Sequence, residues 1–500
     1  MQADKAYILA LDQGTSSSRA ILYDLKGSTV AQAQHTFDMS FPADGWVEQN
    51  PEVLWQTTLQ SGRDVIAKAK IDAAEIACVG ITNQRETTLL WERESGQCVY
   101  NAIVWQDRRT AQYCETLAQQ TIAGLPAADY IAQHTGLVID PYFSGTKLKW
   151  ILDEVANART RAVSGDLCFG TVDSYLIWKL TGGSKHVTDV TNASRTQLLD
   201  IHTLQFDDHL LSTFDIPTSV LPEVLQSADD FGVCDPQWFG APIPITGVAG
   251  DQQAALVGQA CFSPGMTKST YGTGCFVMAN TGNQIVQSST NLLSTVAYKV
   301  AGETSYALEG SLFVAGVAIK WLRDNLGLIH SAQETEAAYI NTGGDSGGVY
   351  VVPAFTGLGA PHWNPKARGT VTGLTLDSTR DQMITAFLQG VVFQTEELLS
   401  AMAQDGANVS SLRVDGGMVV NNALCQCLAD VLNVDVQRPA DVETTALGAA
   451  LLAGLGQGIF ADLKSAADGW QLEQAFSPQW SDDRRQQQIE NYRRAVLRVL

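Results

Sequence analysis

The stretch Tyr7–Tyr23, YILALDQGTSSSRAILY, decides the fold. Its apolar run Tyr7–Leu11 is closed by polar residues, Ser16–Arg19 is typical of a turn, and Ala20–Tyr23 is apolar again. Two short apolar runs separated by a glycine-containing loop predict a β-hairpin. Working outward, 29–37 is expected to add a third strand, Glu52–Ala69 a helix, and Ile76–Thr82 a further strand. Strands that alternate with amphipathic helices predict an α/β fold.

The loop of this hairpin carries groups suited to phosphate. Gly14 permits a tight turn, and the N–H groups and hydroxyls after it are typical of anion-binding loops. Asp12 at the strand end is a ligand type that Mg²⁺ prefers, and Arg19 can neutralise phosphate charge. Taken alone, an ordinary hairpin turn rich in small polar residues explains the stretch equally well.

The second half of the chain repeats the opening pattern. Met266–Tyr271 reads as a strand, Gly272-Thr273-Gly274 as a tight loop and Cys275–Ala279 as a second strand. Two such units in one chain of 500 residues predict two related domains that face each other, with a boundary near 250–265. We therefore expect an N-terminal domain over 1–255 and a C-terminal domain over 256–500.

Composition excludes several classes of protein. With 45% hydrophobic and 17% charged residues, the chain is globular rather than disordered. A net charge of −21 argues against a nucleic-acid or anionic-membrane partner. The sequence shows no apolar run long enough to span a bilayer and no signal peptide, and its nine scattered cysteines are typical of reduced thiols. We expect a cytoplasmic protein without membrane insertion.

Three further motifs follow predicted strands. Gly247–Gln253 places Asp251 between a glycine-rich turn and a helix, where α/β folds carry catalytic groups, although a simple helix N-cap is the alternative. Asp415–Asn422 has paired glycines that admit a flat ligand or phosphate, or that merely serve a strand-to-helix turn. Arg85 and Glu86 can bind two hydroxyls of a polyol, one as donor and one as acceptor, or form an ordinary surface ion pair.

A serine motif competes with these. Gly344-Asp345-Ser346-Gly347-Gly348 matches the nucleophile elbow of hydrolases, but the elbow needs a strand before it and a helix after it. Here a helical stretch precedes and a strand follows, so a flexible loop is favoured. Because the sequence has neither a Walker A motif nor a complete Gly-x-Gly-x-x-Gly, any ATP site must use another scaffold, such as the facing hairpin domains of actin-like ATPases.

The chain resembles the FGGY carbohydrate kinases over essentially its whole length. The matching stretches are ALDQGTSSSRA, GITNQRETTLLW, VWQDRRT, DPYFSGTKLKWILDE, GTVDSYLIWKLTGG, VTDVTNASRT, GVAGDQQAALVGQ, YGTGCF, YALEGS, VPAFTGLGAPHWNPKARG, RVDGGMVVNN and TALGAALLAG. Within the family, the Arg85-Glu86 pair with Trp105 and the Asp251-Gln252 pair point to glycerol more than to an aldose or ketose.

The resemblance implies two RNase H-like domains with an active-site cleft between them, and phosphorylation of glycerol to sn-glycerol 3-phosphate by ATP. It implies a glycerol pocket made of Arg85, Glu86, Trp105, Tyr142, Asp251, Gln252 and Phe276. It implies ATP contacts at Thr15, Ser16, Ser17, Arg19, Thr273, Gly316, Gly417 and Asn421, with Lys320 near the nucleotide where close relatives carry Gln. Asp251 matches the general base, and Asp12 with Asp251 lies near Mg²⁺. A homo-oligomer, dimer or tetramer, is also expected.

Three other functions stay open at this stage. The nearest is a polyol or sugar kinase of the same family with a different acceptor. An actin-like ATPase would hydrolyse ATP without a small-molecule acceptor, and a serine hydrolase would act through Ser346.

Overall fold

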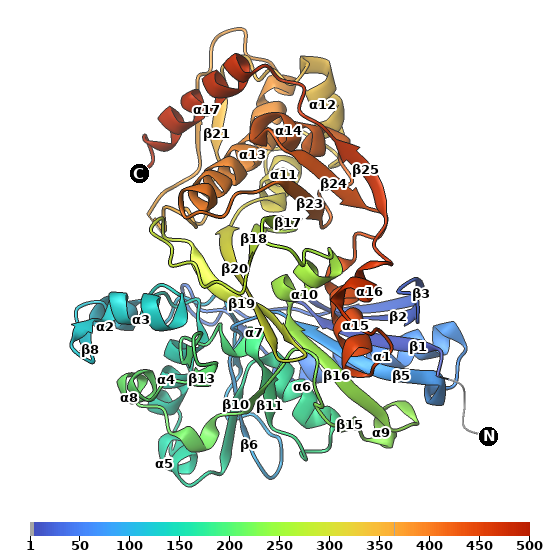
Figure 1. Ribbon diagram of the computed structural model, residues 1–500. Helices are drawn as coiled ribbons and strands as arrows, with labels where there is room; N and C mark the ends of the chain where they lie inside the picture. Colours follow the sequence, from blue (N-terminus) through green and yellow to red (C-terminus); the bar gives the residue numbers. More distant parts are fainter. Residues whose placement is uncertain (1–4, 365) are drawn as a thin grey trace.

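Two halves, each built on one mixed β-sheet, lie one above the other in the computed structural model (Figure 1). The structure describes residues 5–364 and 366–500. The first sheet has the order β15-β16-β5-β1-β2-β3, and the second has the order β19-β20-β18-β17-β23-β24-β25. The strands of the first sheet are β1 (Tyr7–Gln13), β2 (Ser17–Asp24), β3 (Thr29–Thr36), β5 (Ile76–Asn83), β15 (Val233–Cys234) and β16 (Ile243–Gly250). Those of the second are β17 (Met266–Tyr271), β18 (Cys275–Gly282), β19 (Leu293–Val300), β20 (Glu303–Leu312), β23 (Ser411–Asp415), β24 (Asp435–Pro439) and β25 (Leu472–Phe476).

The two sheets share one topology, which confirms the predicted repeat. In the first, β1 pairs antiparallel with β2 and parallel with β5, and β5 pairs parallel with β16. In the second, β17 pairs antiparallel with β18 and parallel with β23, and β23 pairs parallel with β24. The predicted α/β class is therefore confirmed, while the division at 255/256 stays a prediction.

The first hairpin differs from its prediction in one detail. Strand β2 begins at Ser17, so Arg19 lies within the strand opposite Asp12 rather than in a turn over 16–19. The reason is that the N–H of Gly14 donates to the carbonyl of Ser17 (2.9 Å), which closes the loop within three residues and lets the ladder start early.

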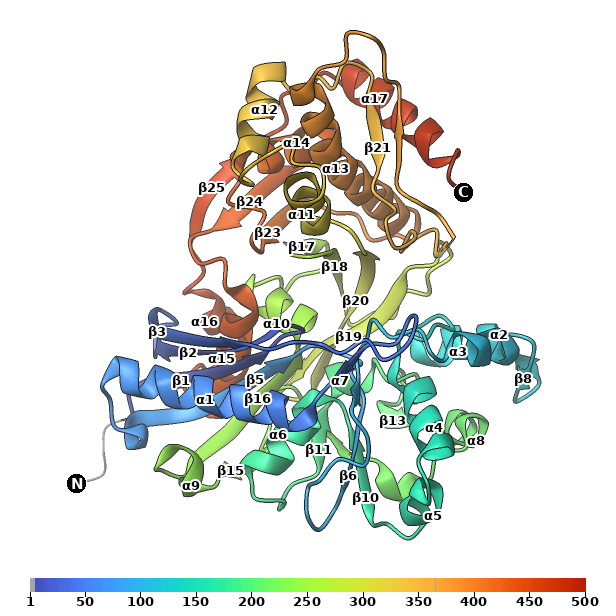
Figure 2. The ribbon, with the colours of Figure 1, turned by 180° about the vertical axis from the view of Figure 1, so that it is seen from behind.

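Both faces of the first sheet are covered by helices that come from distant parts of the chain. Leu9 and Leu11 of β1 pack with α1 (Pro51–Ala69), whereas the alternate residues Ile8 and Ala10 pack with α15 (Thr444–Gly456). Figure 2 shows α1 along the near side of this sheet. This alternation is the period-2 pattern of a strand buried on both faces.

Helix α15 approaches its neighbours so closely that it needs glycine. A Cβ on Gly448 would lie 1.8 Å from the carbonyl oxygen of Ala254 in α10 (Asp251–Gly258), and a Cβ on Gly258 would lie 1.9 Å from that of Thr444. The backbones of α10 and α15 therefore touch. All residues from 446 to 454 of α15 are buried.

The remaining helices frame the two sheets. The second half contains α11 (Gly316–Asp324), α12 (Glu334–Thr342), α13 (Arg380–Gln404), α14 (Asn422–Leu432), α16 (Leu463–Ala467) and α17 (Asp482–Val496). The first half contains α2 (Ala111–Leu117), α3 (Ala127–Thr135), α4 (Ser144–Glu154), α5 (Ala158–Val163), α6 (Val172–Leu180), α7 (Val190–Ala193), α8 (Asp208–Phe214) and α9 (Pro236–Phe239). Among the described residues, no helix is both long and apolar enough to cross a membrane.

Candidate active site

A cavity of about 590 Å³ collects predicted site residues from both halves of the chain. Its lining includes Thr15, Arg85, Glu86, Trp105, Tyr142, Asp251, Gln252, Thr273 and Phe276. The lining also includes apolar side chains, namely Leu312, Phe313, Val314, Val317, Leu358 and Trp363. All seven residues of the expected glycerol pocket therefore meet in one place.

The sheet brings these residues together at one edge. Strands β1, β5 and β16 run parallel, and the chain leaves their carboxyl ends at the loop after Gln13, at Gln84 and at Asp251. The N–H of Gln84 donates to the carbonyl of Gln13 (2.8 Å), which ties two of these exits to each other. Parallel α/β sheets place ligand sites at this edge.

Arg85 and Glu86 are buried, so the surface ion-pair interpretation is wrong. Each side chain is 1% exposed, with Arg85 Nε and Glu86 Oε1 3.8 Å apart. Arg85 also lies 3.3 Å from Asp251 Oδ1 through Nε and donates to Glu309 through both terminal nitrogens. Burying a charge is costly unless it is paired, and here each charge has a partner.

Asp251 opens α10 but does not cap it. The N-cap is Gly250, and the Asp251 carboxylate accepts the N–H of the adjacent Gln252 (2.7 Å). The N-cap interpretation is therefore wrong. Burial raises the pKa of Asp251, while Arg85 and Lys268 act in the opposite direction. A raised carboxyl pKa in a cavity is typical of a group that exchanges protons.

Aromatic rings form one side of the pocket. The Trp105 ring lies 5.7 Å from that of Tyr142 and 6.2 Å from that of Phe276, both edge to face. The indole N–H of Trp105 donates to the Thr15 hydroxyl (3.0 Å). This contact links the acceptor pocket to the predicted phosphate loop.

The predicted metal residue Asp12 is half-buried near the end of β1. Burial raises its pKa to about 6, with Arg19 opposing the shift and the charge of Asp251 adding to it. Arg19 forms an ion pair with Glu443, and the Ser17 hydroxyl accepts from Gln34 (2.8 Å). Asp12, Ser16, Ser17 and Arg19 are not among the residues that line the cavity itself.

The expected nucleotide contacts of the second half lie around the repeated hairpin. The N–H of Gly316 donates to Gly272 (3.0 Å), and a Cβ on Gly316 would lie 2.6 Å from the Gly272 oxygen. A Cβ on Gly417 would meet no atom within 4 Å. Asn421 is the N-cap of α14, and its side chain accepts the N–H of Leu424. Lys320 is exposed on α11. Gly316, Lys320, Gly417 and Asn421 do not line the 590 Å³ cavity, and their nucleotide role stays a prediction.

Sequence reasoning missed three buried charges beside the pocket. Glu309 on β20 binds Arg85 and Arg195, Arg195 binds Glu86 (2.7 Å), and Lys268 on β17 donates to Gln252. Burial raises the pKa of Glu309, but Arg195 and Arg85 together outweigh it and bring the pKa to about 2. Glu309 and Lys268 are charged residues inside strands, which is a signal that sequence reasoning could have used, whereas Arg195 lies in the turn after α7.

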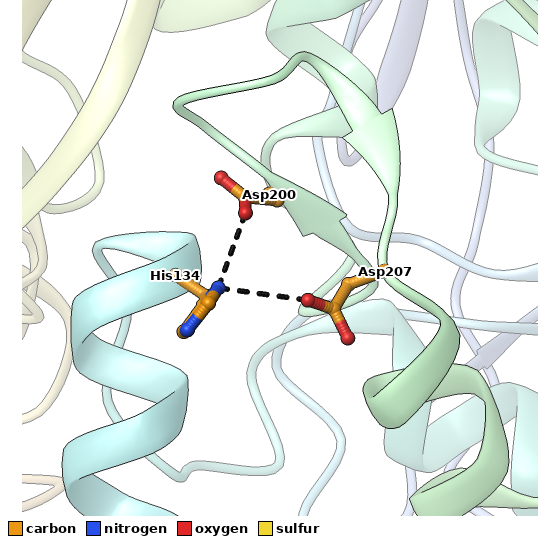
Figure 3. A group of neighbouring side chains, drawn as sticks. All are labelled: His134, Asp200 and Asp207. Carbon is orange, nitrogen blue, oxygen red and sulfur yellow. Dashed lines mark hydrogen bonds and ion pairs between the residues drawn. The ribbon is translucent and has the colours of Figure 1, made fainter. Parts of the chain in front are cut away.

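Another titratable cluster lies outside the cavity. Figure 3 shows Nδ1 of His134 on α3 facing the carboxylates of Asp200 (3.1 Å) and Asp207 (3.6 Å). Within the described part of the chain, this is the one group of three such side chains close enough to share a metal ion. Asp207 also caps α8, accepting the N–H of Leu210 (2.9 Å), and accepts from Tyr130 (3.0 Å). These contacts join α3 to the start of α8.

The serine motif has no elbow geometry. Ser346 lies in the loop between α12 and β21 (Tyr350–Val352), so a helix precedes it and a strand follows. The elbow requires the opposite order. The loop interpretation is confirmed.

Comparison with known proteins agrees with this arrangement. Residues 7–258 match the N-terminal domain and residues 267–456 the C-terminal domain of the FGGY family of carbohydrate kinases. Glycerol kinase 1 of Pseudomonas aeruginosa is 56% identical over 493 residues, covering 99% of both chains. Glycerol kinase of Alcanivorax borkumensis is 55% identical over 494 residues, covering 99% of this chain and 98% of that one.

Solved structures carry the same fold. The crystal structure of Plasmodium falciparum glycerol kinase with ADP has a TM-score of 0.91 at 34% identity, covering 100% of this chain and 99% of that one. A ligand-bound xylulose kinase from Lactobacillus acidophilus has a TM-score of 0.87 at 22% identity, which shows the fold alone. With both domains matched in order and with relatives identical at more than half of their positions, the chain belongs to the FGGY family of carbohydrate kinases.

Proposed function

We propose that this chain phosphorylates glycerol with ATP to give sn-glycerol 3-phosphate. The observation that carries the proposal is the single cavity in which Arg85, Glu86 and Asp251 meet both glycine loops. The relatives named glycerol kinase support the choice of acceptor. An acceptor alcohol and a phosphate-binding loop must adjoin for direct phosphoryl transfer.

Each pocket residue has a role that its chemistry allows. Arg85 donates to, and Glu86 accepts from, two adjacent hydroxyls, while Trp105 and Phe276 pack against the carbon edge. Lysine has only donors, so the Gln252 oxygen faces Lys268 and its NH₂ group is left for the acceptor. Asp251 accepts the proton of the terminal hydroxyl as that oxygen attacks the γ-phosphorus, and the bond from the γ-phosphorus to the β,γ-bridging oxygen breaks to release ADP.

The donor set near the loop fits a magnesium ion. Asp12 and Asp251 bring two carboxylates whose charges act on each other, and carboxylate oxygen is the ligand that Mg²⁺ takes beside nucleotide phosphates. Asp12 and Asp251 would hold the ion, which when bound supplies charge neutralisation for the phosphates. The ATP contacts named from the sequence, Lys320 included, belong to this proposal.

Two broader expectations go with it. Nine free cysteines, eight of them buried, support action in the reducing cytoplasm. A dimer or tetramer remains a prediction that light scattering of the purified protein tests.

The deciding experiment is ADP release with Mg-ATP against a panel of polyols and sugars. Glycerol should give the highest kcat/KM, with dihydroxyacetone or glyceraldehyde weaker. A higher value for xylulose or gluconate would assign another acceptor within the family. ADP release without stimulation by any acceptor would favour an ATPase.

A further inference from the structure

Glu309 lies directly behind the proposed glycerol pocket and reaches it from the other half of the molecule. Its side chain is fully buried on β20, whereas Arg85 follows β5 of the first sheet. Oε2 accepts from Arg85 Nη1 (2.5 Å) and Oε1 from Nη2 (2.8 Å). A bidentate contact fixes the plane of a guanidinium group as well as its position.

The other contacts of Arg85 show which edge is left for a ligand. Nη1 also donates to Gln253 (3.2 Å), away from the cavity lining. Nη2 reaches the Tyr142 hydroxyl at 3.4 Å, and Nε lies 3.3 Å from Asp251. Both Tyr142 and Asp251 line the cavity, and both contacts are long for hydrogen bonds. The edge of Arg85 formed by Nε and Nη2 is therefore the one that an acceptor hydroxyl can engage.

Glu309 also acts on the second pocket charge through Arg195. Arg195 Nη2 donates to Glu309 (3.1 Å) and its Nε donates to Glu86 (2.7 Å). Two arginines and two glutamates thus form a buried, neutral quartet whose side chains are at most 1% exposed. Removing one member leaves a buried charge without compensation, so the others must shift.

We propose that Glu309 is a positioning residue for the acceptor: it aims Arg85, and through Arg195 aims Glu86, at two adjacent hydroxyls of the polyol. This inference rests on the proposed function, and it names Glu309 as the group that sets the geometry of the acceptor pocket. Because Glu309 comes from β20 and both arginines from the first half, the pocket acquires this geometry only where the two halves meet.

The test is Glu309→Gln, which keeps the shape, removes the charge and turns one oxygen into a donor that faces an arginine. KM for glycerol should rise by about tenfold or more, the range of a lost charge-assisted bond, while KM for ATP stays within about twofold. The matched control is Glu48→Gln, because Glu48 is likewise buried and paired with a buried arginine, Arg109 (2.8 Å), outside the cavity. It should lower the thermal midpoint and leave KM for glycerol unchanged.

A double variant separates positioning from general destabilisation. Because removing Arg85 leaves only the route through Arg195 to Glu86, Glu309→Gln should raise KM for glycerol by a clearly smaller factor in an Arg85→Ala background than in wild type. Three results would overturn the proposal: effects of the two substitutions on KM for glycerol that multiply in full, an equal rise in KM for glycerol and KM for ATP, or an unchanged KM for glycerol. Glu309→Asp, which keeps the charge but is shorter, serves if the Gln variant does not fold, and it should show a smaller rise of the same kind; no rise refutes the idea.

The wild-type protein in the same assay keeps the two proposals apart. Turnover of glycerol by wild type with no KM effect in either Glu309 variant overturns only the positioning role. If wild type prefers another polyol, the same KM comparison is made with that polyol.

Discussion

Replacing Asp251 with Asn removes the proposed base with almost no change of shape. The carboxylate accepts the Gln252 N–H (2.7 Å) and lies 3.3 Å from Arg85 Nε. An amide oxygen can accept the same hydrogen bond, and the cap of α10 is the backbone of Gly250. We therefore expect a folded protein whose thermal midpoint stays close to that of wild type.

The loss should fall on turnover. Removing a positioned general base costs about 10²–10⁴ in rate, which is about 2.7–5.5 kcal/mol of activation barrier. The change also removes a negative charge beside Asp12, so the upper part of this range is expected. Glycerol binding, measured by titration calorimetry, should be retained because Arg85, Glu86 and the aromatic wall remain.

The assay is kcat from ADP release at saturating glycerol and Mg-ATP. Asp207→Asn is the control, because Asp207 caps α8 outside the cavity and Asn caps helices about as well as Asp. It should keep full turnover. The expected loss in kcat is at least about a hundredfold. An Asp251→Asn protein that keeps more than about a tenth of the wild-type kcat would therefore refute the catalytic assignment.

Three other outcomes are expected. Lys320→Gln should change KM for ATP by less than tenfold, and a larger loss, about 1.4 kcal/mol, would reveal a phosphate contact at this exposed residue. Gly448→Ala should lower the free energy of unfolding by about 1–3 kcal/mol or more, since its Cβ would lie 1.8 Å from Ala254 O, whereas Gly417→Ala, with open space, should not. Burial and the charge of Asp189 raise the pKa of Asp173 from 3.8 to about 7. The protonated carboxyl therefore contributes to the free energy of unfolding in full below pH 3.8, the unfolded pKa, and this contribution is lost as pH rises through 7. Between pH 5 and about 8, the thermal midpoint of Asp173→Asn should therefore rise relative to that of wild type. A difference between the two midpoints that does not change with pH would contradict the raised pKa.

Short stretches of sequence were enough to predict the fold, because the features that decide it lie close together in the chain. The glycines after β1 and β17 mark both hairpins, and the order of strands and helices indicates an α/β sheet. The cover of the first sheet by α15 was beyond such reasoning, since that helix lies more than 300 residues after β5 in the chain. Only close packing in space shows why Gly448 is glycine.

Part of the pocket was predictable from the order of strands and loops, its other residues came from the family resemblance, and the buried charges behind it were not predicted. Arg85, Glu86 and Asp251 follow strand ends, where a ligand site is expected from topology. Glu309 and Lys268 instead lie within strands of the second sheet, and Glu309 is 224 residues from Arg85 in the chain, whereas Lys268 is only 16 residues from Gln252. A charge within a buried strand indicates that a partner exists, but only the assembled fold identifies the partner.

The charges around the cavity also bear on how an acidic chain can bind an anionic nucleotide. Both arginines that line the cavity are already held by carboxylates, Arg85 by Glu309 and Arg108 by Asp140 (2.7 Å). Arg19 at the first hairpin is paired with Glu443. Because these cations are paired within the protein, we expect phosphate recognition in the proposed nucleotide site to rest mainly on the backbone N–H groups and hydroxyls of the two glycine loops and on the magnesium ion. In this proposal the repeated hairpin serves both the fold and nucleotide binding, while the buried Arg85 is kept for the neutral acceptor.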